Sequence, residues 1–562
     1  MKNVIVVFEK QDIPQALYLL AQNADAEIWV FDPHLIDDLK LAGVGNCQFI
    51  PVVFDLEHLS LINEAKTIAI EKRIEFELEQ AIPEAIGCHW QYLNLFYQVV
   101  TIHSYSILFE KLLLNLSDIK FHILIRDVPA QFYALSFWPS MLLLERLNTL
   151  QRPFAAYSYG RFDEVNQLIP AGENFSTKEG PYQAFVHLPT CIYDGPYFAE
   201  EINAVLTKAL NFQSMNWDVP FPSLHTVGLC LASVALARLP APEQAAVTRT
   251  TAAIQEILAD FFNSHLKTEG FAIRQAAYLA KQVEAQMIFY YSLVQEFAVQ
   301  PPQKMILSNH DSGHHGPLTS FARKFNIPVI LLPHAKVFNW PVNFAYSNTV
   351  ALTHPVQGGV IKDFNGKRVT TRLVSFPERH VNNATPVSAL KSIGLVLNKF
   401  SNDGFNLIDT QVYCRGLRNI LAWCKDHDIA CKTRVKPAGT CITWLVEEVG
   451  FDRADLEDNA RGTIADFATG CDICLMYDCP TSGAIDLMRN SIPTVNTVSR
   501  FLDPTEAAIV DASLVPRESV AETLQRLNAY RNNPSELFIF RTRQFACYAG
   551  SFAESLPLRA LL

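Results

Sequence analysis

The sequence lacks the features that direct a chain into a membrane, out of the cell or onto nucleic acid. It has no run of about 18 or more apolar residues, so we expect no transmembrane helix. The N-terminus, MKNVIVVF, starts with a strand-like run and not with the layout of a secretory signal peptide. Lys and Arg number 46 against 57 Asp and Glu, a net charge of −11 that argues against nucleic-acid binding. A cytoplasmic location is expected.

Cysteine offers little for a disulfide framework or a metal centre. The 12 cysteines are scattered along the chain, and without a secretion signal we expect them to be reduced thiols. Cys471 and Cys474 form a Cys-x-x-Cys pair inside an apolar run, but no second pair lies at zinc spacing. We therefore expect neither a metal nor a cofactor.

What is present is typical of a folded globular protein. Hydrophobic residues make up 49% of the 562 residues and charged residues 18%, which argues against disorder. Short apolar runs alternate with helical patterns, and this alternation predicts parallel, Rossmann-like sheets. A helix is expected at 13–22. The expected strands are 4–8, 27–31, 121–126, 304–308, 328–334, 348–355, 370–377, 392–398, 430–437, 471–478 and 492–498.

A polar, proline-bearing connector at 375–388 divides the chain. We expect an N-terminal Rossmann-like domain over 1–380, with a helical section at about 195–300 where apolar residues recur at three- and four-residue steps. A second Rossmann-like domain is expected over 381–540, with a tail at 541–562 that packs back on the first domain. The expected fold class is α/β, with two Rossmann-like domains facing a cleft at the carboxyl ends of their strands.

The stretch 465–498 predicts a strand, a loop of small residues, a helix and another strand. Thr481, Ser482 and Gly483 lie in that loop. Backbone N–H groups and hydroxyls at a helix N-terminus can bind a phosphate. The alternative is that Thr481 and Ser482 only cap the helix.

The order IGLVLN, helix, TRVKP, helix and CDICLMYDCPTSGAIDLMRNSIPTV resembles the nucleotide-binding half of GT-B-fold glycosyltransferases. The likeness is to enzymes that build bacterial capsules and lipopolysaccharides, including sialyltransferases, Kdo transferases and related glycerophosphotransferases. The preceding helix and IPVILLPHA resemble their acceptor half, so the resemblance covers roughly 300–500. Two departures stand out. His334 precedes Ala335 where the family often has Gly, and Lys436-Pro437 precedes Ala438 where the family often has His.

The resemblance implies a metal-independent, inverting glycosyltransferase. Its donor would be a nucleotide sugar, with a CMP-activated nonulosonic acid or Kdo favoured and a UDP- or GDP-sugar as the alternative. The acceptor would be a hydroxyl of a cell-surface polysaccharide or glycolipid, which implies peripheral association with the inner face of the membrane. The donor-binding candidates are Ser401, Asn402, Arg434, Lys436, Thr481, Ser482 and Gly483.

Base candidates follow two expected strands of the first half. His310 and Asp311 come directly after the strand at 304–308, and His334 ends the run PVILLPH. A carboxylate or imidazole there could take the proton of a sugar hydroxyl. Asp311 could equally form an Asx-turn or cap the helix expected near Leu318.

Two other functions stay open at this point. His310, Asp311, His314 and His315 are all metal-ligand types, so a metal-dependent phosphohydrolase could be built from them. The chain could also be a sugar-nucleotide-binding scaffold that kept the fold without the chemistry.

Overall fold

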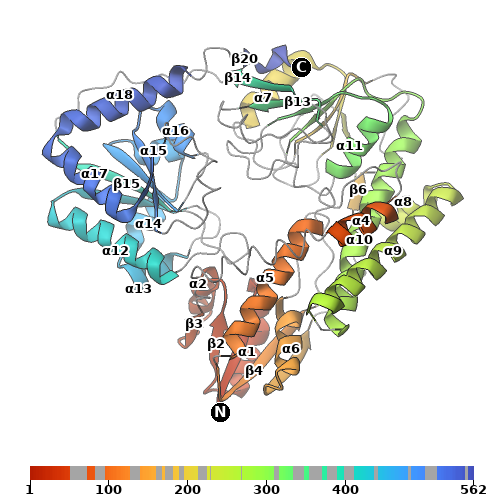
Figure 1. Ribbon diagram of the computed structural model, residues 1–562, viewed down its shortest axis with the longest axis horizontal. Helices are drawn as coiled ribbons and strands as arrows, with labels where there is room; N and C mark the ends of the chain where they lie inside the picture. The colour runs from red at the N-terminus through yellow and green to blue at the C-terminus, as the bar shows by residue number, and fades with distance from the viewer. Residues whose placement is uncertain are drawn as a thin grey trace.

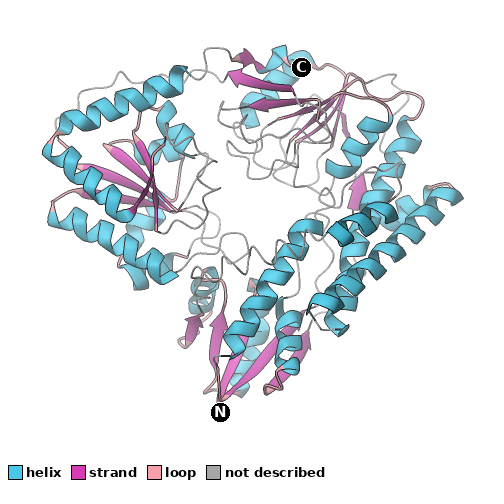
Figure 2. Cartoon of the chain, in the orientation of Figure 1, coloured by secondary structure: helices cyan, strands magenta, loops and turns pink. Residues whose placement is uncertain are grey.

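The computed structural model contains three parallel β-sheets with covering helices (Figures 1 and 2). The α/β class with Rossmann-like sheets is confirmed. None of the helices in the described ranges is long and apolar enough to cross a membrane. The structure describes residues 1–50, 72–82, 95–114, 116–126, 139–159, 168–170, 182–188, 195–212, 225–227, 229–266, 269–308, 315–332, 347–352, 370–375, 389–397, 410–435, 441–478, 483–499, 515–550 and 555–562.

The first sheet has the strand order β3-β2-β1-β4-β5, with every pair parallel. This is the order of a Rossmann sheet, in which the chain reverses direction across the sheet between β1 and β4. The strands are β1 (Lys2–Val7), β2 (Glu27–Val30), β3 (Cys47–Phe49), β4 (Ile119–Arg126) and β5 (Phe154–Tyr159). The helices are α1 (Ile13–Gln22), α2 (His34–Leu41), α4 (Lys72–Ala81), α5 (Leu95–Leu114) and α6 (Pro139–Thr149), with a 3-10 turn η1 (Lys10–Asp12).

Both faces of the first sheet are buried, each in a different core. Val4 and Val6 of β1 belong to a core shared with α5, α6, α10 and the middle sheet. Ile5 and Val7 point to the opposite face, whose core continues through α1 and α2 into the C-terminal sheet. Successive strand residues face opposite sides, so a strand buried on both faces is apolar throughout. Figure 1 shows this N-terminal unit in red and orange, next to both other parts of the chain.

The middle sheet has the order β20-β14-β13-β12-β11-β7-β8-β9, and all its pairs are parallel. Its first strand along the chain, β7, lies between β8 and β11, so the chain reverses direction between β7 and β11. The strands are β7 (Ala184–His187), β8 (Ala209–Phe212), β9 (His225–Val227), β11 (Met305–Leu307), β12 (Val329–Leu331), β13 (Thr349–Leu352), β14 (Thr370–Ser375) and β20 (Leu556–Pro557).

The edge strand β20 comes from the C-terminal segment. Leu556 lies opposite Val374, and Pro557 lies opposite Ser375. Leu558, in the 3-10 turn η7 (Leu558–Ala560), is fully buried in the core of the middle sheet. The segment after the C-terminal sheet therefore completes the middle sheet.

The structure divides residues 1–380 differently from the sequence expectation, because two separate sheets lie within that range. The two sheets nevertheless share a core, because α10 packs on the core of the first sheet as well as on α11. The section at 195–300 also contains β8, β9 and β10, the last paired antiparallel with β6. Runs of three or four apolar residues carry too little periodicity to separate strand from helix. The elements are β6 (Leu168–Pro170), β10 (Leu229–Leu231), α7 (Gly195–Val205), α8 (Ala232–Arg238), α9 (Ala241–Leu266), α10 (Glu269–Phe297) and α11 (His315–Lys324).

The C-terminal sheet has the parallel order β16-β15-β17-β18-β19, so its chain reversal lies between β15 and β17. This is the second common doubly wound order. The strands are β15 (Ser392–Leu397), β16 (Ala430–Arg434), β17 (Ile473–Tyr477), β18 (Thr494–Val498) and β19 (Arg517–Ser519). The helices are α12 (Thr410–Asp426), α13 (Ile442–Val449), α14 (Arg453–Asn459), α15 (Ile464–Ala468), α16 (Gly483–Arg489), α17 (Val520–Asn532) and α18 (Pro534–Gly550).

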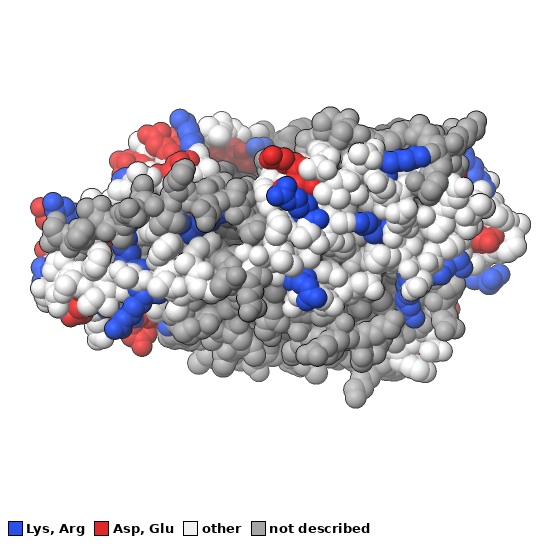
Figure 3. All heavy atoms as spheres, turned by 90° about the horizontal axis from the view of Figure 1, so that it is seen from above, with Lys and Arg blue, Asp and Glu red and all other residues white. Residues whose placement is uncertain are grey.

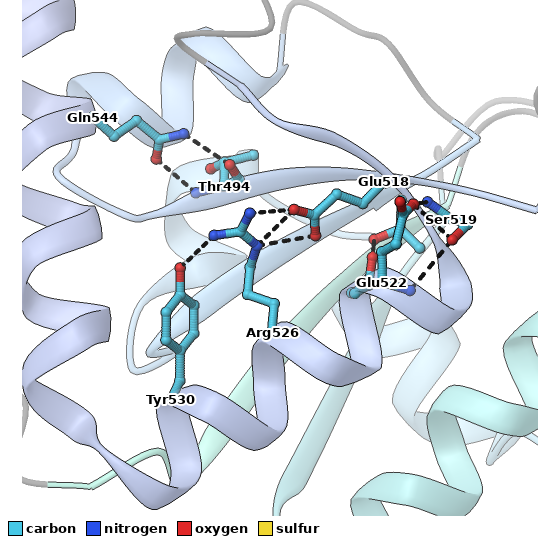
Figure 4. A network of polar contacts seen from close by, with 9 residues as sticks. Thr494, Glu518, Ser519, Glu522, Arg526, Tyr530 and Gln544 are labelled. Carbon is cyan, nitrogen blue, oxygen red and sulfur yellow. Dashed lines mark hydrogen bonds and ion pairs between the residues drawn. The ribbon is translucent and has the colours of Figure 1, made fainter.

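The last two helices are fixed to this sheet by buried polar contacts (Figure 4). The Gln544 side chain accepts the Thr494 N–H and donates to the Thr494 carbonyl, both at 2.8 Å. Thr494 lies at the start of β18, before the residues that pair with β19. Arg526 of α17 donates to both carboxylate oxygens of Glu518, which directly follows the start of β19. Gln544 thus satisfies backbone groups that would otherwise be buried without partners.

The N-terminal unit docks on the C-terminal sheet through α2 and α13. The Asp37 carboxylate accepts the Thr443 N–H at the start of α13, at 3.2 and 3.3 Å. Arg453 approaches the same carboxylate to 3.8 Å. Phe49 packs edge-to-face against Trp444, with 5.7 Å between ring centroids. Burial raises the pKa of Asp37, while the Thr443 N–H and Arg453 act in the opposite direction. A carboxylate of one unit therefore caps a helix of another.

Replacing this cap should weaken the docking. We expect Asp37→Ala to lower the free energy of unfolding by about 0.5–2 kcal/mol, because the first N–H groups of α13 lose their acceptor. Urea unfolding followed by circular dichroism measures the change. Asp38→Ala on the same helix is the control, since Asp38 pairs with the exposed Lys10 and such pairs contribute little. Equal effects of the two substitutions would contradict the capping role.

Gly416 of α12 offers a second test. A Cβ there would lie 2.1 Å from the hydroxyl of Tyr477, which is fully buried and donates to the Tyr413 carbonyl at 2.8 Å. We expect Gly416→Ala to destabilise the fold, because overpacking costs about 1–3 kcal/mol and exceeds the helix-propensity gain of about 1 kcal/mol. Gly550→Ala in α18, with open space around its Cβ position, should be neutral or stabilising by thermal denaturation.

Candidate functional site

In open α/β sheets, ligands bind beyond the carboxyl ends of the strands, where the strand order reverses. This chain has three such positions: β1 beside β4, β7 beside β11, and β15 beside β17. Their chemistry differs, and the difference decides which of them can take a ligand.

The position in the first sheet is closed by the chain itself. Asp12 is buried, and its Oδ2 accepts the N–H groups of Phe8 and Glu9, both at 2.9 Å. The Tyr159 hydroxyl, at the end of β5, donates to the other carboxylate oxygen. The two N–H groups that follow β1 are thus already held by an internal anion. This edge offers them to no external phosphate.

The position in the middle sheet carries buried polar side chains. His187 ends β7, and Ser308 directly follows β11, where its N–H donates to the His187 carbonyl at 3.0 Å. His315 begins α11, and all three residues are at most 1% exposed. The sequence analysis missed His187. His187 ends the apolar run AFVH, just as His310 and Asp311 follow the apolar run at 304–308. A polar residue at the end of an apolar run is therefore the sequence signal by which His187 could have been found.

The expected bases follow strands of this same sheet. His310, Asp311 and His314 lie outside the described residues, but β11 and α11 bracket their loop on both sides. His334, after β12, also lies outside them. Among the residues that the structure describes, no three His, Cys, Asp or Glu side chains converge as metal ligands would. Only His315 of the histidine cluster is described, and it is buried in the first turn of α11.

The position in the C-terminal sheet lies between β15 and β17, which pair directly from Ile393–Ile473 to Leu397–Tyr477. The segment with Ser401 and Asn402 follows β15, and the segment with Thr481 and Ser482 follows β17. These four residues lie outside the described part, as does Lys436 after β16. Gly483 is described and is the first residue of α16. The strands thus bring the starts of all the expected donor segments to one edge.

Arg434 does not present its side chain to that edge. Its guanidinium donates to the carbonyls of Asn459 at 2.6 Å, Arg461 at 3.1 Å and Gly462 at 2.8 Å. It also stacks near the Phe467 ring, and the whole residue is buried. Burial lowers the pKa of Arg434, and Asp466 opposes this shift. These contacts hold the turn after α14, so the donor-binding role expected for Arg434 is not supported.

Asp478 lies at this edge of the sheet and was not singled out from the sequence. It directly follows β17 and has a φ of 45°, a left-handed conformation that Asp tolerates better than most residues. Its N–H donates to the Thr497 carbonyl at 2.9 Å, and its Oδ1 accepts the Ser499 N–H at 2.8 Å. Asp478 therefore fixes the direction in which the chain leaves β17.

No protein-family model matches the chain, and no curated protein matches it. Among solved structures it is similar to MurG of Acinetobacter baumannii, with 9% identity over 67% of this chain and 98% of that one and a TM-score of 0.34. It is also similar to the spinosyn rhamnosyltransferase SpnG complexed with thymidine diphosphate, with 14% identity, the same coverages and a TM-score of 0.32. The glycotransferase of kitacinnamycin gives 10% identity, coverages of 68% and 98%, and a TM-score of 0.34. Values this low do not decide a reaction.

Charge on the molecular surface is mixed. On the face shown in Figure 3, Lys and Arg lie singly or in small groups among uncharged residues. Within the described part of that face, no continuous basic field is present.

Proposed function

We propose that this protein is a glycosyltransferase of GT-B type, in which the middle sheet takes the acceptor and the C-terminal sheet takes a nucleotide sugar. The observation that carries the proposal is the contrast between two doubly wound sheets in one chain. The edge of one has buried imidazoles at the chain reversal, whereas the strands of the other are followed in sequence by segments that contain Ser401, Lys436, Thr481 and Ser482. The return of β20 to the middle sheet joins the two sheets a second time.

The proposed reaction needs one base and one anion site. The acceptor hydroxyl attacks the anomeric carbon of the donor, the base takes its proton, and the bond to the nucleotide phosphate breaks with both electrons on the phosphate. Asp311, His310 and His334 are the proposed base candidates, and we add His187 because it ends β7, beside β11 at the chain reversal of the same sheet.

The anion site is proposed at the start of α16. Of the helices that follow β16 and β17, α13 already has the Asp37 carboxylate at its N-terminus. A second anion there would meet a like charge. Gly483 begins α16 just beyond the carboxyl end of β17, so we assign the phosphate to Thr481, Ser482 and Gly483, with Lys436, Ser401 and Asn402 from the segments after the neighbouring strands. A CMP-activated nonulosonic acid or Kdo is the proposed donor, with a UDP- or GDP-sugar second.

A thermal-shift screen with CMP, CDP, UDP, GDP and ADP, each with EDTA and with Mn²⁺ or Zn²⁺, tests this proposal. A ligand that binds only the native state raises its melting temperature. A shift with one nucleotide in EDTA would support the transferase and identify the donor base. A response to metal alone would instead favour a hydrolase built on the 310–315 histidine cluster.

Two substitutions test the donor site. We expect Lys436→Ala and Ser482→Phe to weaken binding of that nucleotide about ten- to a hundredfold, because each removes or blocks a charge-assisted phosphate contact. Isothermal titration measures the Kd. Lys391→Ala is the control, because Lys391 precedes β15 at the opposite end of the sheet. Unchanged affinity in both test variants would show that the phosphate binds elsewhere.

The base is tested by separating catalysis from donor binding. Substitution of the residue that is the base, tested by Asp311→Asn and by His187→Gln, should lower kcat by about 100-fold or more while the nucleotide Kd stays constant, because the proposal does not place the donor on the middle sheet. Nucleotide release from the donor sugar gives kcat. His265→Gln, on α9, is the matched control. If both variants turned over at the rate of the unmodified protein, neither residue could be the base.

A further inference from the structure

The opposite end of the C-terminal sheet carries a pair of thiols that sugar transfer does not use. Cys471 precedes β17, and Cys474 is the second residue of that strand. In the register of the sheet, Gly394 of β15 lies between Lys432 of β16 and Cys474 of β17. These residues lie near the amino ends of their strands, away from the edge where the donor loops begin.

Because Gly394 has no side chain, the sulfur atoms of Cys471 and Cys474 occupy the space beside it. A Cβ on Gly394 would lie 2.7 Å from the Sγ of Cys474 and 3.2 Å from the Sγ of Cys471. Any larger residue at this position would displace one or both sulfurs. The two thiols also hydrogen-bond to each other. They therefore lie in direct contact without a covalent bond.

The two thiols have different surroundings. Cys474 is fully buried, whereas Cys471 is partly exposed. The Lys432 side chain reaches the Thr469 carbonyl at 3.2 Å, two residues before Cys471. The hydrogen bond from Cys474 lowers the pKa of Cys471 against the effect of burial, and Lys432 adds to the lowering. The same hydrogen bond, together with burial, raises the pKa of Cys474. Cys471 is thus the thiol that ionises first.

A second pair in the same domain provides a comparison. Cys424, in the last turn of α12, hydrogen-bonds with Cys431 of β16. Cys424 is buried, and both the Cys431 thiol and burial raise its pKa. This pair is the internal comparison for the oxidation of Cys471 and Cys474.

We propose that Cys471 and Cys474 form a dithiol that hydroperoxides oxidise to a disulfide. The Cys471 thiolate attacks one oxygen of hydrogen peroxide, the O–O bond breaks, and the hydroxide released takes a proton to leave as water. The Cys474 thiol then attacks the sulfenic acid of Cys471, which forms the S–S bond and releases a second water. Two electrons pass from the thiols to one peroxide. This proposal does not depend on the transferase reaction.

The experiment oxidises the full-length protein with one equivalent of hydrogen peroxide and maps the products by mass spectrometry. Trypsin leaves Cys471, Cys474 and Cys479 in one peptide, 462–489, so Cys479→Ser is the background for mapping. We expect this peptide to lose the mass of two hydrogens and to regain it after reduction. Cys424 and Cys431 lie in separate tryptic peptides, 419–425 and 426–432, so a bond between them would appear as a cross-link.

Two variants test the order of events. Cys474→Ser should stop the reaction at a sulfenic acid on Cys471 that dimedone traps. Lys432→Gln should slow oxidation about three- to tenfold, and Lys432→Arg should restore it, because the thiolate fraction depends on the nearby cation. Oxidation that begins at Cys424–Cys431 or at the exposed Cys547 would overturn the proposal. A peptide 462–489 that stays reduced while those sites react would overturn it as well.

Discussion

Burial of both faces of the first sheet is the constraint on which the rest of the structure depends. Val4 and Val6 enter one core, Ile5 and Val7 enter another, and the alternation continues in β2. A shift of one residue in register would exchange the two sets of side chains, so the strand is held in place from both sides. Because one core continues into the middle sheet and the other into the C-terminal sheet, the N-terminal unit acts as a fixed spacer between them.

The N-terminal unit has a structural role, and the proposed chemistry is assigned to the other two sheets. The N-terminal unit has the strand order of a nucleotide-binding sheet, but Asp12 holds the N–H groups at its chain reversal and Asp37 caps a helix of another unit. These two acidic residues bind backbone N–H groups of the protein itself. In a ligand-binding sheet, the same positions would face a ligand. The proposed chemistry is left to the other two sheets, whose relative position depends on this unit and on the pairing of β20 with β14.

Much of the fold could be predicted from the sequence where the signal was local. The helix at 13–22 matches α1, and the apolar runs at 392–398 and 471–478 contain β15 and β17. What the sequence could not provide depends on partners distant along the chain. The strands β8, β9 and β20 are two to four residues long and gain their stability from neighbours in the sheet. The first and middle sheets also share a core, and such contacts between residues distant along the chain leave no local pattern in the sequence.

The candidate site follows the same rule. Strand ends are local features, so the ends of β11, β15 and β17 could be predicted from the sequence. The role of a side chain at a strand end depends on what lies opposite to it. Arg434 lies in the expected strand at 430–437 and ends β16, but its side chain meets three carbonyls of a distant turn. His187 ends a strand that pairs with β11, and Met305 of β11 lies 118 residues further along the chain.

The pairing of β20 with β14 has a consequence for biosynthesis. A ribosome makes β14 before the whole C-terminal sheet and makes β20 only after it. Until then, the edge of β14 that β20 covers has backbone groups that can pair with another chain. In the nascent protein this edge therefore stays uncovered until the whole C-terminal sheet has been made, and an uncovered strand edge favours aggregation.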